Sequence, residues 1–238
     1  MAGRSGEPEV IWARPERTGR GPRPAYTRGD IAAAAVRVAD ADGLDAVSMR
    51  RVAAEIGCGT MSLYNYVPRK VDLYELMVDL VSGEYDLSRA PAGDWRADLM
   101  DLAHQARGIM RRHPWVIRVM SSVYSISPNA LRVLDWTLAA LEGLDVPPGT
   151  KLELFGMVNG SVMTFVANEQ AVAERTRSEP WSAEREQAVR GAYMVSQVAT
   201  GAYPHLAALF AQGVAPVDDP EAAFDRMLRR LLESFAPQ

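Results

Sequence analysis

SMRRVAAEIGCGTMSLYNYVPRK, residues 48–70, predicts two short helices joined by a glycine turn, and this stretch decides the fold. Ser48 can cap the first helix, because its hydroxyl can accept a hydrogen bond from a free backbone N–H of the first turn. Three apolar residues then recur at helical spacing: Val52, Ala53 and Ile56. Gly57 follows directly, at the position where a residue with positive φ ends a helix. The first helix is therefore predicted over 48–56.

The second helix is predicted over 60–66, with Thr60 or Gly59 as its cap. Pro68 ends it, because the residue before a proline is pushed out of helical geometry. Helices that cross closely need a small residue on the first helix, a glycine in the turn and a branched apolar residue on the second. These places are occupied by Ala53, Gly57 and Leu63. The pattern is typical of a helix-turn-helix, which places its second helix in the major groove of DNA. A buried helical hairpin is the alternative, but it would not need exposed polar and cationic side chains.

The second helix would expose side chains that are small or able to reach bases and phosphates. They are Thr60, Met61, Ser62, Asn65 and Tyr66. The other expected DNA contacts are Thr27, Arg28, Arg50, Tyr64 and Lys70. Among these, Arg50 and Lys70 would hold phosphates, with Arg50 also able to reach a base, and Tyr64 would pack against backbone or sugar.

The sequence from Thr27 to about Leu80 resembles the DNA-binding domain of the TetR family of bacterial transcriptional regulators. The matching residues are IAAAAVRVADADGLDAVSMRRVAAEIGCGTMSLYNYVPRKVDLYELMVD, with the DG turn, RRVAAEIG, LYNYV and K-x-x-L at family spacing. The resemblance implies an all-α chain with an N-terminal three-helix helix-turn-helix domain and a larger C-terminal helical bundle. It also implies a dimer that binds double-stranded DNA and a small-molecule effector. The rest of the chain resembles the family in length and helical character.

Length and composition agree with a two-domain helical protein, because 238 residues with 48% apolar content can form two real cores. Three His and one Cys leave little for metal or disulfide chemistry, so no metal and no cofactor are expected. Cys58 cannot pair within the chain, which suits a reducing cytoplasm. No signal peptide and no membrane span are evident, so a cytoplasmic protein without membrane contact is expected.

Charge is unevenly distributed along the chain. Residues 1–70 hold 11 Lys/Arg and 8 Asp/Glu, whereas residues 71–238 hold 15 and 22. A basic end on an acidic body is expected if one end meets phosphates, although chance asymmetry on solvated faces gives the same pattern. Residues 1–26, rich in Gly, Pro and Arg, predict a disordered basic arm. This arm either follows the DNA or is a solubilising tail.

Three parts are predicted: the arm at 1–26, a helix-turn-helix domain at 27–87 and a ligand-binding and dimerisation domain at 88–238. The first helix should start near Thr27, with Asp30 completing a capping box, and a fourth should run from Lys70 to about residue 81. The C-terminal helices are predicted at 95–113, 115–122, 128–143, 150–173, 183–199 and from 220 onward. Thr150 is the predicted cap of the helix at 150–173, and His113 is interpreted as a residue before a proline at a helix end. Residues 200–219 are predicted to be irregular.

Methionine and aromatic residues concentrate in the central helices of the C-terminal part. They can line an adaptable apolar pocket or simply fill the core. The candidate ligand contacts add polar side chains, since a polar group facing inward needs a partner that a ligand can supply. They are His104, Arg107, Trp115, Tyr124, Trp136, Asn159 and Met163. The resemblance to the TetR family implies an apolar or amphipathic small molecule as the effector.

The helix at 150–173 and the last helix are the predicted dimer helices. Gly156 and Gly160 would allow close approach, and Leu228 and Leu232 would provide apolar ridges. The alternative is that both helices line the core of the single chain. One short recognition helix reads few bases, so a homodimer on a near-palindromic operator is predicted.

The predicted function is a ligand-responsive transcriptional regulator, in the first instance a repressor that its effector releases from DNA. A ligand-independent architectural DNA-binding protein is the second hypothesis, and an all-helical enzyme is the third. The enzyme has little support, because the chain has no Gly-rich phosphate loop and no G-x-S-x-G, H-E-x-x-H or C-x-x-C. Asp94, Asp98 and Asp101 precede His104 on one helix, but such clusters are usually a solvated face. No catalytic residue is predicted.

Overall fold

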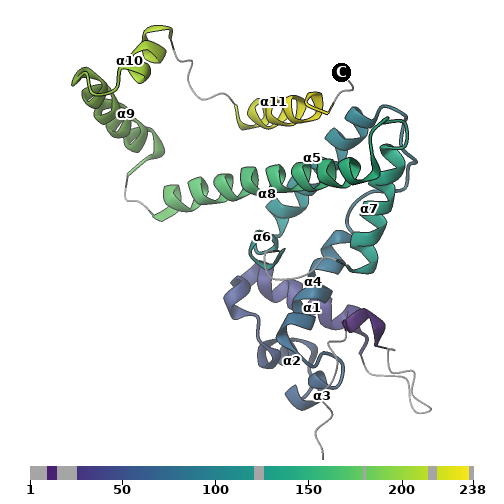
Figure 1. The fold of residues 1–238 in the computed structure, drawn as a ribbon. Coiled ribbons are helices and arrows are strands. Elements are labelled where there is room, and N and C mark those ends of the chain that lie inside the picture. The colour runs from purple at the N-terminus through teal and green to yellow at the C-terminus, as the bar shows by residue number, and fades with distance from the viewer. Residues whose placement is uncertain (1–9, 15–25, 121–125, 179–180, 214–218, 236–238) are drawn as a thin grey trace, which may run out of the picture. The chain divides into compact units, whose positions relative to one another are not determined.

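The computed structural model describes residues 10–14, 26–120, 126–178, 181–213 and 219–235. Every regular element within these ranges is helical, which confirms the predicted all-α fold (Figure 1). The α-helices are α1 Arg28–Asp42, α2 Met49–Ile56, α3 Thr60–Tyr64, α4 Lys70–Ser82, α5 Trp95–Arg112, α6 Val116–Met120, α7 Pro128–Ala140, α8 Pro148–Ser178, α9 Ala183–Ala199, α10 Pro204–Ala211 and α11 Pro220–Glu233. Two short 3-10 turns are η1 Ile11–Ala13 and η2 Leu44–Ala46.

The chain forms two compact units that divide inside the long helix α8. The first unit comprises residues 1–163 and 235–238, and the second comprises residues 164–234. Helix α4 contacts both α6 and α7. The helices on either side of the predicted boundary at residue 88 therefore lie in one compact unit.

Helix α1 begins as its sequence predicts. The Thr27 hydroxyl accepts from the Asp30 backbone N–H at 3.1 Å, and the Asp30 carboxylate accepts from the Thr27 backbone N–H at 2.8 Å. This is the predicted capping box with the shorter acidic residue. The hydrogen bonds from the Thr27 side chain and backbone lower the pKa of Asp30. One face of the helix is fully buried through Ile31, Ala34, Ala35 and Val38.

Residues 10–14 belong to the arm that was predicted to be disordered, yet they form an ordered turn. Ile11 is 1% exposed and opens η1. The Arg28 Nη1 group donates to the carbonyl oxygens of Ile11 at 3.0 Å and Arg14 at 2.9 Å. Burial of Ile11 and these hydrogen bonds offset the conformational entropy that the turn loses. Residues 1–9 and 15–25 of the arm lie outside the described ranges.

The C-terminal helices follow the predicted pattern with differences at α8 and α10. Helix α8 begins at Pro148 and not at a Thr150 cap, because proline is well suited to a first helical turn. It also extends five residues beyond 173, where Glu174 and Arg177 pair at 2.7 Å. Helix α10 lies in the stretch predicted to be irregular. That prediction was wrong because Pro204 sits in the first turn and opens the helix instead of breaking it.

In the second unit, α8 and α11 pack through apolar side chains. The rings of Phe165 and Phe224 meet edge to face with centroids 5.1 Å apart. Leu228 and Leu232, predicted as ridges of a dimer interface, are 0% and 2% exposed within the single chain. They are therefore core residues, which was the alternative interpretation. No described helix has an apolar stretch that is long enough to cross a bilayer.

Candidate nucleic-acid interface

The turn between α2 and α3 has the geometry that its sequence predicts. The Ser48 hydroxyl accepts from the Arg51 backbone N–H at 3.1 Å and caps α2. Gly57 ends that helix with φ 80° and ψ 32°, a left-handed conformation that glycine adopts without strain. The Cys58 N–H donates to the Ala53 carbonyl at 2.9 Å and closes the turn. Gly59 is the N-cap of α3, and no side chain caps that helix.

A shared buried face fixes α3 against its neighbours. Its members are Val52 (0% exposed), Ala53 (1%), Leu63 (1%) and Val67 (0%). Helix α2 contacts both α1 and α3. Leu63 is the member of this buried face that belongs to α3, so burial of its side chain holds the short helix in place. The opposite face of α3 remains on the surface.

The predicted contact residues of α3 lie on that surface. Met61 is 79% exposed and Tyr64 is 42% exposed. Asn65 is exposed as well, and the half-buried members are Thr60, Ser62 and Tyr66. This face offers hydroxyl, amide and thioether groups beside one another, which are groups able to reach base edges and phosphates.

Two cations flank α3. Arg50 is exposed and forms no ion pair with any residue that the structure describes, whereas the adjacent Arg51 pairs with Asp42 at 3.2 Å and Glu55 at 3.6 Å. Lys70 is exposed at the first position of α4, with its Nζ 5.3 Å from the centre of the Tyr74 ring. Arg50 and Lys70 thus present exposed cations before and after α3 in the chain.

The two predicted contacts at the start of α1 already have partners within the chain. The Thr27 hydroxyl donates to Asp30 at 2.7 Å in the capping box. Arg28 is half-buried and donates to the turn at Ile11 and Arg14. Thr27 therefore has the capping role that its sequence predicts, whereas Arg28 has a structural role that the sequence analysis did not give it.

Arg69 and Asp72 form a structural pair that sequence reasoning missed. Asp72 is 1% exposed, and its carboxylate accepts from the Arg69 backbone N–H and Nε, both at 3.0 Å. The pair closes the segment between α3 and α4. The spacing of three residues between Arg69 and Asp72 at the start of a helix is the sequence signal that could have predicted this pair.

Comparison with known proteins agrees with this geometry. The model described as "Bacterial regulatory proteins, tetR family" matches residues 31–77, and the model described as "Tetracyclin repressor-like, C-terminal domain" matches residues 87–236. The chain belongs to the TetR family. The resemblance of residues 27–80 is thereby confirmed, and it extends over the C-terminal part.

Individual TetR-family relatives match over nearly the whole chain. The HTH-type transcriptional repressor DrrR1 of Streptomyces coeruleorubidus is 36% identical over 95% of this chain and 83% of its own length. An HTH-type transcriptional regulator of Saccharopolyspora erythraea is 31% identical over 97% of this chain and 93% of its own. The structure of ActR of Streptomyces coelicolor in complex with actinorhodin aligns with a TM-score of 0.72 at 23% identity, covering 88% of this chain and 96% of ActR. The last likeness is one of fold.

Two polar contacts join the DNA-binding helices of this TetR-family protein to α6 and α7. Asp45 in η2 accepts from Arg118 on α6 at 2.9 Å, and the hydrogen bond from Arg118 lowers the pKa of Asp45. Asp79 on α4 accepts from the Asn129 backbone N–H, at the start of α7, at 2.7 Å. These contacts connect α6 to the 3-10 turn before α2, and the start of α7 to α4.

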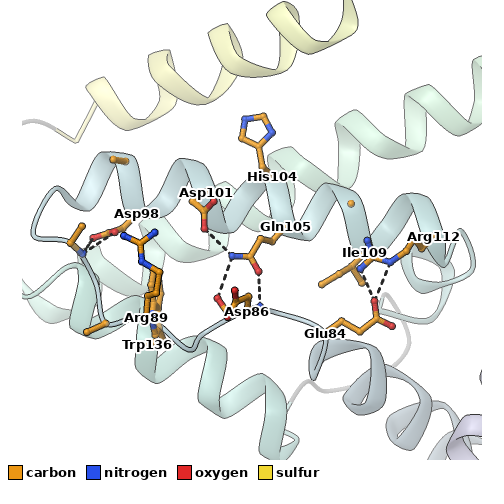
Figure 2. A pocket seen from close by; sticks show the side chains of 14 residues that line it. Glu84, Asp86, Arg89, Asp98, Asp101, His104, Gln105, Ile109, Arg112 and Trp136 are labelled. Atoms are coloured by element: carbon orange, nitrogen blue, oxygen red, sulfur yellow. Dashed lines mark hydrogen bonds and ion pairs between the residues drawn. The ribbon is translucent and has the colours of Figure 1, made fainter.

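A cleft of about 780 Å³ runs along α5 in the first unit. Figure 2 shows the segment from Glu84 to Arg89 facing α5 across this cleft, with Trp136 of α7 beside Arg89. Gln105 of α5 bonds to this segment, since its Oε1 accepts from the Asp86 backbone N–H at 2.7 Å. Its Nε2 donates to Asp101 on the same helix at 2.8 Å. The ionisable side chains that line the cleft are Glu84, Asp86, Arg89, Asp98, Asp101, His104 and Arg112. The lining of the cleft is therefore too polar to favour a purely apolar ligand.

Of the seven ligand candidates from the sequence, six lie in the part of the chain that the structure describes, and the cleft along α5 is lined by two of these six. These two are His104 and Trp136, and the Trp136 indole N–H donates to the Arg89 carbonyl at 2.9 Å. Arg107 is on α5 but buried, and Trp115 is also buried. Asn159 and Met163 are half-buried on α8, and Tyr124 lies outside the described residues. The sequence analysis did not identify Gln105 or Asp86 as cleft residues. Polar residues of this kind occur on any exposed surface, so their pattern does not indicate a cleft.

Proposed function

We propose that this chain is a transcriptional repressor that binds a near-palindromic operator as a homodimer and leaves it when a small amphipathic effector binds. The observation that supports DNA reading is the exposed face of α3, where Met61 and Asn65 stand on a helix anchored by Leu63. Arg50 and Lys70 on either side can neutralise phosphates. The relative DrrR1, which is 36% identical, is named a transcriptional repressor, and this favours repression.

Selection of bound duplexes from random DNA tests the proposal. We expect an enriched inverted repeat whose half-sites lie about one helical turn apart, or a multiple of that distance. Asn65→Ala should change the preferred base at one position of each half-site, because an Asn side chain can bind adenine through two hydrogen bonds. Asn168→Ala, at an exposed position of α8, is the matched control and should keep the wild-type preference. A wild-type selection without any enriched repeat would contradict the proposal.

Two surfaces support the homodimer. On α8, Leu152 and Met157 are about half exposed, and added Cβ atoms at Gly156 or Gly160 would meet no atom within 4 Å. On α9, four apolar side chains are 45–66% exposed: Val189, Tyr193, Met194 and Val195. Uncovered apolar surface on a soluble chain usually marks an interaction site. Sedimentation at micromolar concentration should give a dimer, and a monomer there would contradict this assignment.

The cleft along α5 supports an amphipathic effector, because it places the Trp136 ring beside several ionisable groups. ActR, which has the same fold, binds a small molecule, actinorhodin. Release of DNA requires that the effector bind better to the conformer that does not bind DNA, since equal affinity for both shifts nothing. An inducing metabolite fraction should raise the melting temperature and lower DNA binding together. If no fraction does either, a ligand-independent DNA-binding protein is the better description.

A further inference from the structure

Met61 is the most exposed large apolar side chain in the part of the chain that the structure describes. It is 79% exposed, whereas the next such side chains, Tyr193 and Val195, are 66% exposed. It belongs to α3, whose opposite face is held in place by the buried Leu63. Single apolar side chains on a surface are common, but Met61 lies on the face that is proposed to meet DNA. Its chemistry therefore limits which base edge can lie against it.

The sequence of α3 lacks the side chains that most often recognise guanine. Residues 60–66, TMSLYNY, contain no Arg and no Lys, and these are the side chains that bind the O6 and N7 atoms of guanine through two hydrogen bonds. Asn65 carries the one side-chain amide of this stretch, and an Asn amide matches the N6 and N7 atoms of adenine. The composition of the α3 face therefore favours A·T base pairs.

The thioether of Met61 suits only one of the groups that bases present in the major groove. A thioether has no hydrogen-bond donor and is a weak acceptor, so a polar base edge covered by it would lose hydrogen bonds to water without a replacement. The apolar group among these base edges is the C5-methyl group of thymine. Contact between this methyl group and Met61 removes apolar surface of both from water, and the flexible methionine side chain can adjust to it. Thymine is therefore the base that Met61 fits.

Met61 and Asn65 lie on the same face of α3, because they stand four residues apart. Asn65 is the C-cap of the helix, and its backbone is still helical with φ −70° and ψ −23°. Side chains at this spacing have Cβ atoms about 5–6 Å apart, and successive base pairs are about 3.4 Å apart along the duplex. The bases that Met61 and Asn65 contact should therefore lie within about two base pairs of each other.

We propose that Met61 is a specificity-determining residue that recognises the methyl group of one thymine in each half-site, within about two base pairs of the adenine bound by Asn65. The inference rests on the proposed DNA-binding function and adds to it the kind of base pair that α3 recognises. The two positions differ in how they are recognised, because the thymine position depends on one methyl group and the adenine position on hydrogen bonds.

Replacement of thymine by deoxyuracil tests the methyl contact, because deoxyuracil keeps the hydrogen-bonding groups of thymine and lacks only the methyl group. Each thymine of a duplex enriched by the wild-type protein is replaced in turn, in both half-sites at once. Fluorescence anisotropy at constant ionic strength gives the affinity. At one position the wild type should lose about tenfold, since two half-sites each lose one methyl contact worth about threefold to fourfold. An affinity that changes at no thymine would overturn the proposal.

Substitutions of Met61 show whether this residue makes the methyl contact. Met61→Ala should bind the thymine and deoxyuracil duplexes with affinities within about twofold of each other, because the pair no longer interacts. Met61→Leu keeps an apolar side chain and should keep most of the preference for thymine, whereas Met61→Gln is polar and should lose it. Leu131→Ala, which removes a side chain of α7 that is 47% exposed, is the matched control and should keep the wild-type preference. A full preference for thymine in Met61→Ala would overturn the proposal.

Asn65→Ala locates the second position independently. Its preference for adenine should disappear at one position, while its sensitivity to deoxyuracil remains. The two positions should lie within about two base pairs of each other, and a larger separation would overturn the proposed arrangement of Met61 and Asn65. An enriched duplex without methyl dependence would refute this inference alone. Absence of any enriched duplex would refute the proposed DNA binding, and the inference with it.

Discussion

Leu63 is 1% exposed, whereas Met61, two residues earlier on α3, is 79% exposed. Two residues along a helix are separated by about 200° of rotation, so these side chains point in nearly opposite directions. Leu63 anchors the helix, and Met61 lies on the face proposed to meet DNA. Stability and DNA binding are therefore assigned to different faces of one short helix.

Substitution of these two residues should separate the two properties. Leu63→Ala should lower the free energy of unfolding by about 2–5 kcal/mol, because it removes a fully buried side chain and leaves a cavity. Met61→Ala should change it by about 0.5 kcal/mol or less and should weaken binding to the selected duplex. Urea denaturation and fluorescence anisotropy measure the two effects. Equal destabilisation by both substitutions would contradict the assignment.

Arg69→Ala should destabilise the segment between α3 and α4, because it leaves the buried Asp72 carboxylate without its side-chain partner. We expect a loss of about 1–3 kcal/mol, below that of a fully buried ion pair, since the Arg69 side chain is 52% exposed and solvent screens it. Arg69→Lys keeps the charge but loses the planar fork, so its loss should be smaller. Thermal melting gives the comparison. An Arg69→Ala protein as stable as the wild type would show that the pair contributes nothing.

Tyr85 should make stability depend on pH in the alkaline range. Burial raises the pKa of Tyr85 to about 12, above the ordinary value of about 10. Below about pH 10 the Tyr85 hydroxyl is neutral in both the folded and the unfolded chain, so it does not make the free energy of unfolding depend on pH there. Between about pH 10 and pH 12 the unfolded chain ionises first, so the free energy of unfolding falls as the pH rises.

Tyr85→Phe should reduce this alkaline loss, because phenylalanine has no proton to lose. Denaturation at several alkaline pH values measures the effect, with the exposed Tyr193 replaced by Phe as the control. If Tyr85→Phe and wild type lose stability in parallel, ionisation of the Tyr85 hydroxyl is not coupled to unfolding.

The N-terminal helices could be predicted because their signals are local. The capping box of Thr27 and Asp30, the Ser48 cap and the left-handed Gly57 each act within a few residues, so the sequence itself contains both partners. Helix α10 shows the limit of such signals, since Pro204 can either break a helix or open one.

Contacts between distant residues could not be predicted in this way. Asp40 and His113 lie 73 positions apart, and a single sequence gives no indication that they meet. His113 was interpreted only as a residue before a proline. For the same reason, four of the described ligand candidates do not line the cleft along α5. Residue type indicates what a side chain can bind but not which side chains share a cavity.

Lys70→Ala should weaken binding to every duplex by a similar factor, because a phosphate contact contains no sequence information. The slope of log affinity against log salt concentration should fall by about one, since one fewer counterion is released from the DNA. Tyr66→Ala should also weaken binding to all sequences but leave the slope unchanged, because tyrosine has no charge. Arg175→Ala, which removes an exposed cation on α8, is the control and should leave both affinity and slope unchanged. A gel-shift titration at several salt concentrations in which Lys70→Ala keeps the wild-type slope would remove Lys70 from the interface.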